Sequence, residues 1–184
     1  MPLRQTLTAV TRALDATRAS GRPSSVGSLT LPEEFELELQ ELGLSGKTFG
    51  PRDYAQALER YLGIRIVLEL MNDRHHPQFL ERLGASQRLA ETHYLPERAA
   101  AVVLLPASLP PYMLAYTMFH ELAHLATGDH LIASEAVGRR LACRPPLQDE
   151  VSREREADLR AAYAVVAGTL GPQNPYAKAL HEVL

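Results

Sequence analysis

The feature that most constrains this chain is a largely apolar stretch, residues 113–126, that carries two histidines and a glutamate. It reads MLAYTMFHELAHLA and contains neither proline nor glycine, so it predicts a buried helix from about Pro110 to Thr127. Gly128 follows as the expected C-terminal cap. Burying imidazoles and a carboxylate costs free energy unless they have partners, so these three polar residues need a purpose.

The three residues are His120, Glu121 and His124, in the pattern HELAH. Positions four apart lie on one helical face, so both imidazoles can reach a single ion, and imidazole nitrogen suits zinc. Glu121 lies beside that position and can take a proton from a water that zinc activates. The alternative is a helix with two partly buried histidines and a salt-bridging glutamate, which the apolar flanks disfavour.

A catalytic zinc site needs a third protein ligand, and Glu154 is the first candidate. It lies in SREREADLRAA, on a predicted helix over residues 148–167, four residues before Asp158. These two acids share the small and apolar face, so we expect Glu154 to bind the metal and Asp158 to hydrogen-bond a ligand histidine. Glu156 is predicted to point the other way, toward Arg160 and solvent. A surface helix with Glu–Arg pairs is the alternative.

His130 is the second candidate for the third ligand. It follows His124 by six residues, the spacing of the metzincins. Gly128 comes one place later than that pattern needs, and no methionine follows Met118 to form the downstream Met turn. We therefore interpret His130 as a rim residue of the site, with a metzincin-like ligand role as the alternative.

Secondary-structure patterns place helices first, then strands, then helices, which predicts an α+β fold with a small mixed or antiparallel sheet. Strands are expected at 64–70, 88–94 and 100–105, and earlier helices at 32–42 and 51–62. We divide the chain into an N-terminal helical extension with a linker, residues 1–50, and a domain of residues 51–184. The extension comprises a predicted amphipathic helix, 3–18, and a Gly/Pro/Ser-rich linker, 21–32.

Composition narrows the function classes. The formal net charge is −3 and the pI is about 6.2, so no overall basic field favours direct nucleic-acid binding. A single cysteine, Cys143, excludes an internal disulfide and fits a reducing compartment. We see no signal peptide, and prolines interrupt the longest uncharged stretch, residues 99–119, so we expect a cytoplasmic protein without membrane contact. The oligomeric state is left open.

The chain resembles the ImmA/IrrE family of metallopeptidases over about residues 50–170. The likeness is carried by ALERYLGIRIVLEL before the motif, AYTMFHELAHLATGDH around it, and EREADLRAAYAVV after it. The resemblance implies a zincin-like fold in which a small sheet packs on the HExxH helix and a C-terminal helix bears the glutamate. It implies His120, His124 and Glu154 as Zn²⁺ ligands and Glu121 as the base. It also implies an intracellular substrate, typically a helix-turn-helix repressor cleaved in a stress response.

The sequence thus predicts a zinc-dependent metallo-endopeptidase that acts on a protein or peptide substrate, with a DNA-binding repressor as candidate. We expect the peptide to add to an edge strand, with 100–105 as the candidate, and a side chain such as Tyr116 or His130 to stabilise the oxyanion. Two alternatives remain: a catalytically silent zinc-binding module that binds a regulator, and a metzincin-like peptidase that uses His130 as third ligand.

Overall fold

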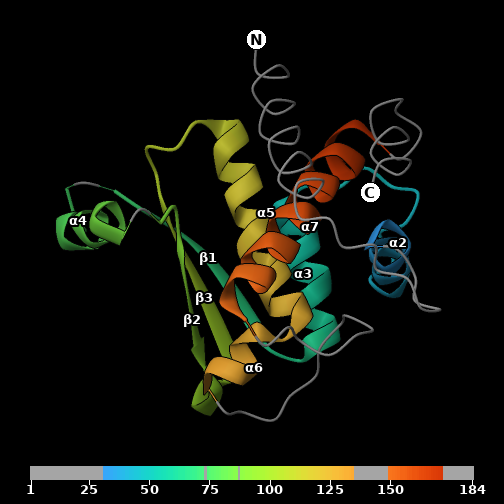
Figure 1. Ribbon diagram of the computed structural model, residues 1–184, viewed down its shortest axis with the longest axis horizontal. Coiled ribbons are helices and arrows are strands. Elements are labelled where there is room, and N and C mark those ends of the chain that lie inside the picture. Colours follow the sequence, from blue (N-terminus) through green and yellow to red (C-terminus); the bar gives the residue numbers. More distant parts are fainter. Residues whose placement is uncertain (1–30, 73, 87, 135–148, 172–184) are drawn as a thin grey trace.

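The computed structural model describes residues 31–72, 74–86, 88–134 and 149–171 (Figure 1). The predicted helix at 3–18, most of the predicted linker and Cys143 lie outside these residues. The elements follow in this order: α2 (Leu31–Glu41), α3 (Pro51–Leu62), β1 (Arg65–Met71), α4 (Pro77–Ser86), β2 (Glu91–Leu95), a 3-10 turn (Pro96–Arg98), β3 (Ala100–Pro106), α5 (Pro111–Thr127), α6 (Asp129–Ser134) and α7 (Glu150–Leu170).

The described strands form one three-stranded mixed sheet in the order β1-β3-β2. β1 pairs with β3 in parallel, and β2 pairs with β3 antiparallel. The predicted α+β class with a small mixed sheet is therefore confirmed. The prediction that residues 100–105 form an edge strand is wrong, because β3 hydrogen-bonds to a neighbour on both sides. Within the described part of the chain, β1 and β2 are the outer strands.

Side chains of β3 point alternately to the two faces of the sheet, and both faces are covered by helices. Ala101, Val103 and Leu105 are fully buried on one face, where Ala101 packs in the cluster that holds Phe119 of α5. Leu104 points the other way and packs on the small cluster built from α4. Figure 1 shows α4 on the opposite side of the sheet from α5 and α7.

α5 and α7 lie side by side (Figure 1), and small residues on α7 permit this close packing. Ala157, Ala161 and Ala164 are all at most 2% exposed. The helix ends follow local signals: Gly128 caps α5 in the left-handed region with φ 87°, and the Asp149 side chain accepts a hydrogen bond from the Ser152 amide at the start of α7. Both helices begin and end close to the predicted residues.

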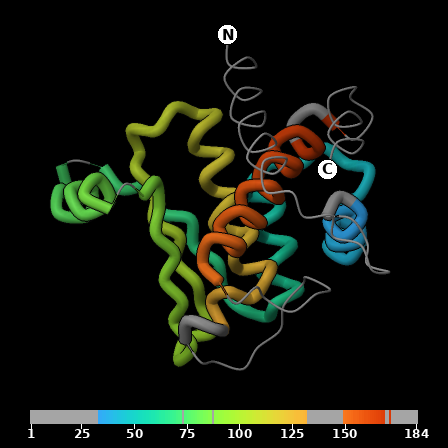
Figure 2. Tube along the Cα trace, viewed as in Figure 1, coloured from blue at the N-terminus to red at the C-terminus, as the bar shows by residue number. Residues whose placement is uncertain are grey.

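The main core runs across the predicted boundary between residues 50 and 51. Phe35 of α2 contacts the ring of Tyr163 at 5.3 Å, and Phe49 contacts Phe119 at 6.0 Å, both edge to face. The Phe49 amide also donates to the Gly168 carbonyl. Figure 2 shows α2, in blue, beside the helices rather than beside the sheet. Residues 31–49 thus share one core with α3, α5 and α7.

Glu156 points toward Arg160, as predicted, but the expectation that this side of α7 faces solvent is wrong. Arg160 is 1% exposed; its guanidinium donates to Glu38 of α2 and, at 2.7 Å, to Glu156. The reason is that α2 covers this face of α7, which a helical pattern in α7 alone does not reveal. Burial raises the pKa of Glu38, and Arg160 opposes that shift.

Among the described helices, none combines the length and the apolar character that a membrane crossing requires.

Candidate metal centre

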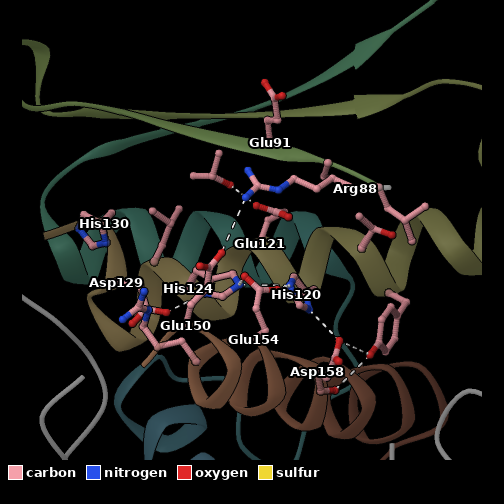
Figure 3. A pocket seen from close by; sticks show the side chains of 17 residues that line it. Arg88, Glu91, His120, Glu121, His124, Asp129, His130, Glu150, Glu154 and Asp158 are labelled. Carbon is pink, nitrogen blue, oxygen red and sulfur yellow. Dashed lines mark hydrogen bonds and ion pairs between the residues drawn. The ribbon is translucent and has the colours of Figure 1, made fainter. Parts of the chain in front are cut away.

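α5 brings His120 and His124 onto one face, one turn apart, with ring centroids 4.8 Å apart. Their Nε2 atoms lie 3.1 Å from each other. The opposite face of α5 is fixed in the core, where Phe119, Leu122 and Leu125 are at most 1% exposed. This packing sets the rotation of α5, so both imidazoles face the groove between α5, α7 and β2 (Figure 3).

Glu154 of α7 reaches both imidazoles. Its Oε2 lies 3.2 Å from His120 Nε2, and its Oε1 lies 3.6 Å from His124 Nε2. His120, His124 and Glu154 each offer one potential ligand atom, and these three atoms lie within 4.8 Å of one another. Among the described residues, these three form the group that could hold a metal ion. Figure 3 shows the three side chains pointing toward one another. The structure thus brings together the predicted set.

Each imidazole is oriented from behind by an aspartate. His120 Nδ1 lies 2.9 Å from Asp158 Oδ1, and His124 Nδ1 lies 2.7 Å from Asp129 Oδ2. A carboxylate accepts a hydrogen bond, so each Nδ1 carries a proton, and each Nε2 is the nitrogen that faces the groove, where it could bind a metal ion once it has lost its own proton. Carboxylate partners of this kind are typical of metal-binding histidines.

Asp158 lies where the sequence predicted it, whereas sequence reasoning missed Asp129. Asp129 is the first residue of α6, directly after the glycine that ends α5. The turn at Gly128 brings its carboxylate back onto the last turn of α5. The signal was the Gly-Asp pair directly after the motif, but a glycine cap by itself does not show which side chain the returning chain brings to His124.

The electrostatics favour a positive charge between these groups. Burial lowers the pKa of His120, but hydrogen bonds to Asp158 and Glu154 outweigh it and raise the pKa to about 10. For His124, burial acts in the same direction, and hydrogen bonds to Asp129 and Glu154 raise its pKa to about 9. The two imidazoles hold the pKa of Glu154 well below its usual range. The carboxylates around the two imidazoles therefore favour positive charge on the imidazole rings.

The arrangement fits a tetrahedral zinc ion. Ligands at 2.0–2.1 Å in a tetrahedron lie about 3.3 Å apart. The two Nε2 atoms lie 3.1 Å apart, and each is near one oxygen of Glu154, His120 at 3.2 Å from Oε2 and His124 at 3.6 Å from Oε1. Two imidazoles and one carboxylate favour zinc over calcium or magnesium, which prefer oxygen ligands alone. If these three residues held a zinc ion, a fourth position would remain for water or substrate, as in catalytic zinc sites.

Glu121 is beside this group but outside it. Its Oε2 accepts a hydrogen bond of 2.5 Å from Thr92 Oγ1 on β2. Both residues line a cavity of about 510 Å³ that also includes His120, His124 and Glu154. Figure 3 shows Glu121 between β2 and the two histidines. Thr92 was not predicted, since nothing in the sequence places residue 92 next to residue 121.

His130 lines the cavity, in line with its interpretation as a rim residue, and the Tyr116 hydroxyl lies behind His120. The His130 ring lies edge-on to Tyr94 at 4.7 Å, and His130 is not among the three grouped ligand residues, although it lines the cavity. The Tyr116 hydroxyl donates to Asp158 Oδ1 at 2.8 Å. Tyr116 therefore supports the aspartate behind His120, and His130 occupies the rim.

No family model matches this chain, and searches of the curated proteins and of the solved structures find no match either.

Proposed function

We propose that this protein is a zinc-dependent metallo-endopeptidase of zincin-like architecture that hydrolyses a peptide bond in an intracellular protein. The observation that carries the proposal is the convergence of two imidazole Nε2 atoms and the Glu154 carboxylate, with an aspartate behind each imidazole. Glu121 beside this group supplies the acid–base residue that a purely structural zinc site does not need.

The residues divide the chemistry between them. His120, His124 and Glu154 would hold the zinc, which when bound polarises a carbonyl group and makes water more acidic. Glu121 accepts a proton from the attacking water at its carboxylate and later donates it to the leaving amine. Asp129 and Asp158 keep the two imidazoles in the tautomer that presents Nε2 to the groove.

β2 is the strand along which we expect the peptide substrate to lie. It is an outer strand of the described sheet, and residues 88–92 line the cavity together with the site face of α5. An outer strand offers backbone groups to an added peptide strand. Peptide binding along β2 would carry a carbonyl group past Glu121.

The choice of substrate rests on the resemblance to the ImmA/IrrE family, which favours a helix-turn-helix repressor in the cytoplasm. A regulator encoded beside this gene is the first substrate to test. A proteome-derived peptide library, read by mass spectrometry of new N-termini, covers other substrates without assuming one.

The deciding experiment compares wild type, Glu121→Gln and a control, Glu81→Gln, on the exposed side of α4. All three are loaded with zinc, and zinc content is measured before the assay. We expect new N-termini from wild type and Glu81→Gln, and at least a 100-fold lower rate from Glu121→Gln with zinc content unchanged, since removing the general base costs about 10²–10⁴.

Cleavage by the Glu121→Gln variant at the wild-type rate would refute this mechanism. Zinc bound at one equivalent without cleavage of any library peptide or regulator would instead support the silent module that binds a regulator.

A further inference from the structure

The hydrogen bond between Thr92 and Glu121 joins two elements that are 29 residues apart in the chain. Thr92 is in β2 and Glu121 is in α5, and both side chains are half-buried at the cavity. The threonine hydroxyl occupies Oε2 of the carboxylate. Among the hydrogen bonds of the described residues, none is recorded for Oε1, so this oxygen can serve a water or a substrate.

A glutamate side chain turns about three bonds, so a base at a cavity needs a partner to hold one geometry. Threonine is well suited to this task. Its branched Cβ restricts χ1, which gives its hydroxyl a defined direction from the strand. Serine would offer the same hydroxyl with more rotational freedom, and valine would keep the shape and remove the donor.

The part of β2 that carries Thr92 is fixed by strand pairing and by a contact with α4. In register it pairs with Val103 of the central strand β3. On the outer face, the neighbouring Glu91 accepts two hydrogen bonds from Arg82 of α4, at 3.0 and 2.9 Å. The strand that carries Thr92 is therefore held in place before any ligand arrives, which favours a preorganised site.

A purely structural role, in which the bond only ties β2 to α5, is less well supported. Tyr94, two residues along on the same face, already packs against the core cluster and against His130. β3 anchors β2 along all five residues of the strand. The strand thus has other attachments, whereas the Thr92 hydroxyl meets a single acceptor, the carboxylate beside the grouped ligands.

We propose that Thr92 is a positioning residue: its hydroxyl holds the Glu121 carboxylate in the orientation in which the free oxygen faces the attacking water. This inference rests on the proposed function and adds a residue to it. It assigns to β2 a second role besides peptide binding, since the same strand then aligns the base with the substrate.

The test uses the full chain with Co²⁺ in place of zinc and acetohydroxamate as the probe. The probe binds a divalent ion through two oxygens and offers a proton that a neighbouring carboxylate can accept. Cobalt absorbance follows its dissociation constant without any peptide substrate. The variants are Thr92→Val, Thr92→Ser, Glu121→Gln and the double variant Thr92→Val with Glu121→Gln.

We expect Thr92→Val to weaken acetohydroxamate binding about fivefold, the effect of one lost hydrogen bond, and Thr92→Ser to restore most of it. In the Glu121→Gln background, Thr92→Val should change nothing further, because the residue acts through Glu121. Metal content and melting temperature should stay the same in all variants. With a cleaved peptide, Thr92→Val should lower kcat roughly tenfold and leave KM unchanged.

Arg82→Gln is the matched control, because it loosens β2 from its outer face without touching Glu121. If Arg82→Gln reproduces the loss seen in Thr92→Val, the role is structural and the proposal is wrong. An equal loss in the Glu121→Gln background, or no loss at all, also overturns it, as does a cobalt-loaded wild type that binds no acetohydroxamate. Coupling between the two residues without cleavage of any peptide would uphold the positioning role and count against the proposed peptidase.

Discussion

α7 carries two groups of charged side chains, and they lie in different surroundings. Glu154 and Asp158 have side chains 54% and 46% exposed and meet the histidines of α5. Arg160, two residues further on, is 1% exposed and meets Glu38 and Glu156. One helix thus serves an open cavity on one side and a closed interface with α2 on the other.

The difference between the two groups is the source of their positive charge. In the buried group, the guanidinium of Arg160 lies among three carboxylates and supplies them with a positive charge from within the chain. At the cavity, the converging atoms are two imidazole nitrogens and a carboxylate, whose positive charge comes from a bound proton that a metal ion could replace. Similar residues therefore stabilise the fold where an arginine supplies the positive charge, and form a candidate binding site where a proton or a metal ion has to supply it.

Removing the built-in cation should give the largest effect. Arg160→Met is expected to lower the free energy of unfolding by about 3–5 kcal/mol, because it leaves buried carboxylates without a counter-charge. Urea unfolding followed by circular dichroism measures this. The triple variant with Glu38→Met and Glu156→Met should recover much of the loss. A single variant as stable as wild type would mean that the buried group is not balanced by Arg160.

On the cavity side, Glu154→Ala should abolish stoichiometric zinc binding and leave the metal-free fold nearly unchanged, since the side chain is half exposed. Zinc at 100 times its dissociation constant should stabilise wild type by about 2.7 kcal/mol and this variant hardly at all. Metal analysis after dialysis and thermal unfolding provide the readouts. Glu150→Ala, on the same helix, and His130→Ala should retain zinc. Loss of zinc in His130→Ala with retention in Glu154→Ala would favour the metzincin-like ligand set.

The aspartates behind the imidazoles should have intermediate effects. Asp129→Asn and Asp158→Asn are each expected to lower zinc affinity about 10–100-fold, because the ligand histidines lose the partner that fixes their tautomer. Competition with a chromophoric chelator measures the affinity. Tyr116→Phe, which removes only the hydroxyl that supports Asp158, should cost less than Asp158→Asn. Equal losses in those two variants would show that Asp158 acts only through Tyr116.

Zinc affinity should also rise with pH above 7. The raised pKa values of His120 (about 10) and His124 (about 9) mean that the metal-free site holds at least one proton at pH 7, and zinc must displace it. Zinc affinity should increase up to about tenfold per pH unit for each proton that zinc displaces. The increase should end at the pH where His120 and His124 have lost their protons without zinc. The free energy of unfolding of the metal-free protein should instead fall as the pH rises. Because folding raises the pKa of His120 and His124, their contribution to stability is complete below about pH 6.5 and is lost as the pH rises through 9–10. Chelator competition between pH 7 and 9 tests this, and a flat profile would contradict it.

The sequence by itself determined the local structure of the candidate site. The apolar run with two histidines four apart, closed by Gly128, is enough to predict α5 and the common face of His120 and His124. The acids Glu154 and Asp158, also four apart, are enough to predict that both lie on one side of α7. That this side meets the histidines was a hypothesis, with a surface helix of Glu–Arg pairs as the alternative. Both predictions depend on helical periodicity, which is a short-range property of the chain.

Only the tertiary structure decided which distant groups meet. Thr92 contacts Glu121 because β3 lies between β1 and β2 and leaves β2 at the outside, and strand order cannot be derived from the pattern of a single strand. Arg160 is buried because α2 covers α7, although both helices have polar faces in sequence. The physical reason is that burial of a charge depends on partners supplied across the fold, while a periodic pattern describes one element at a time.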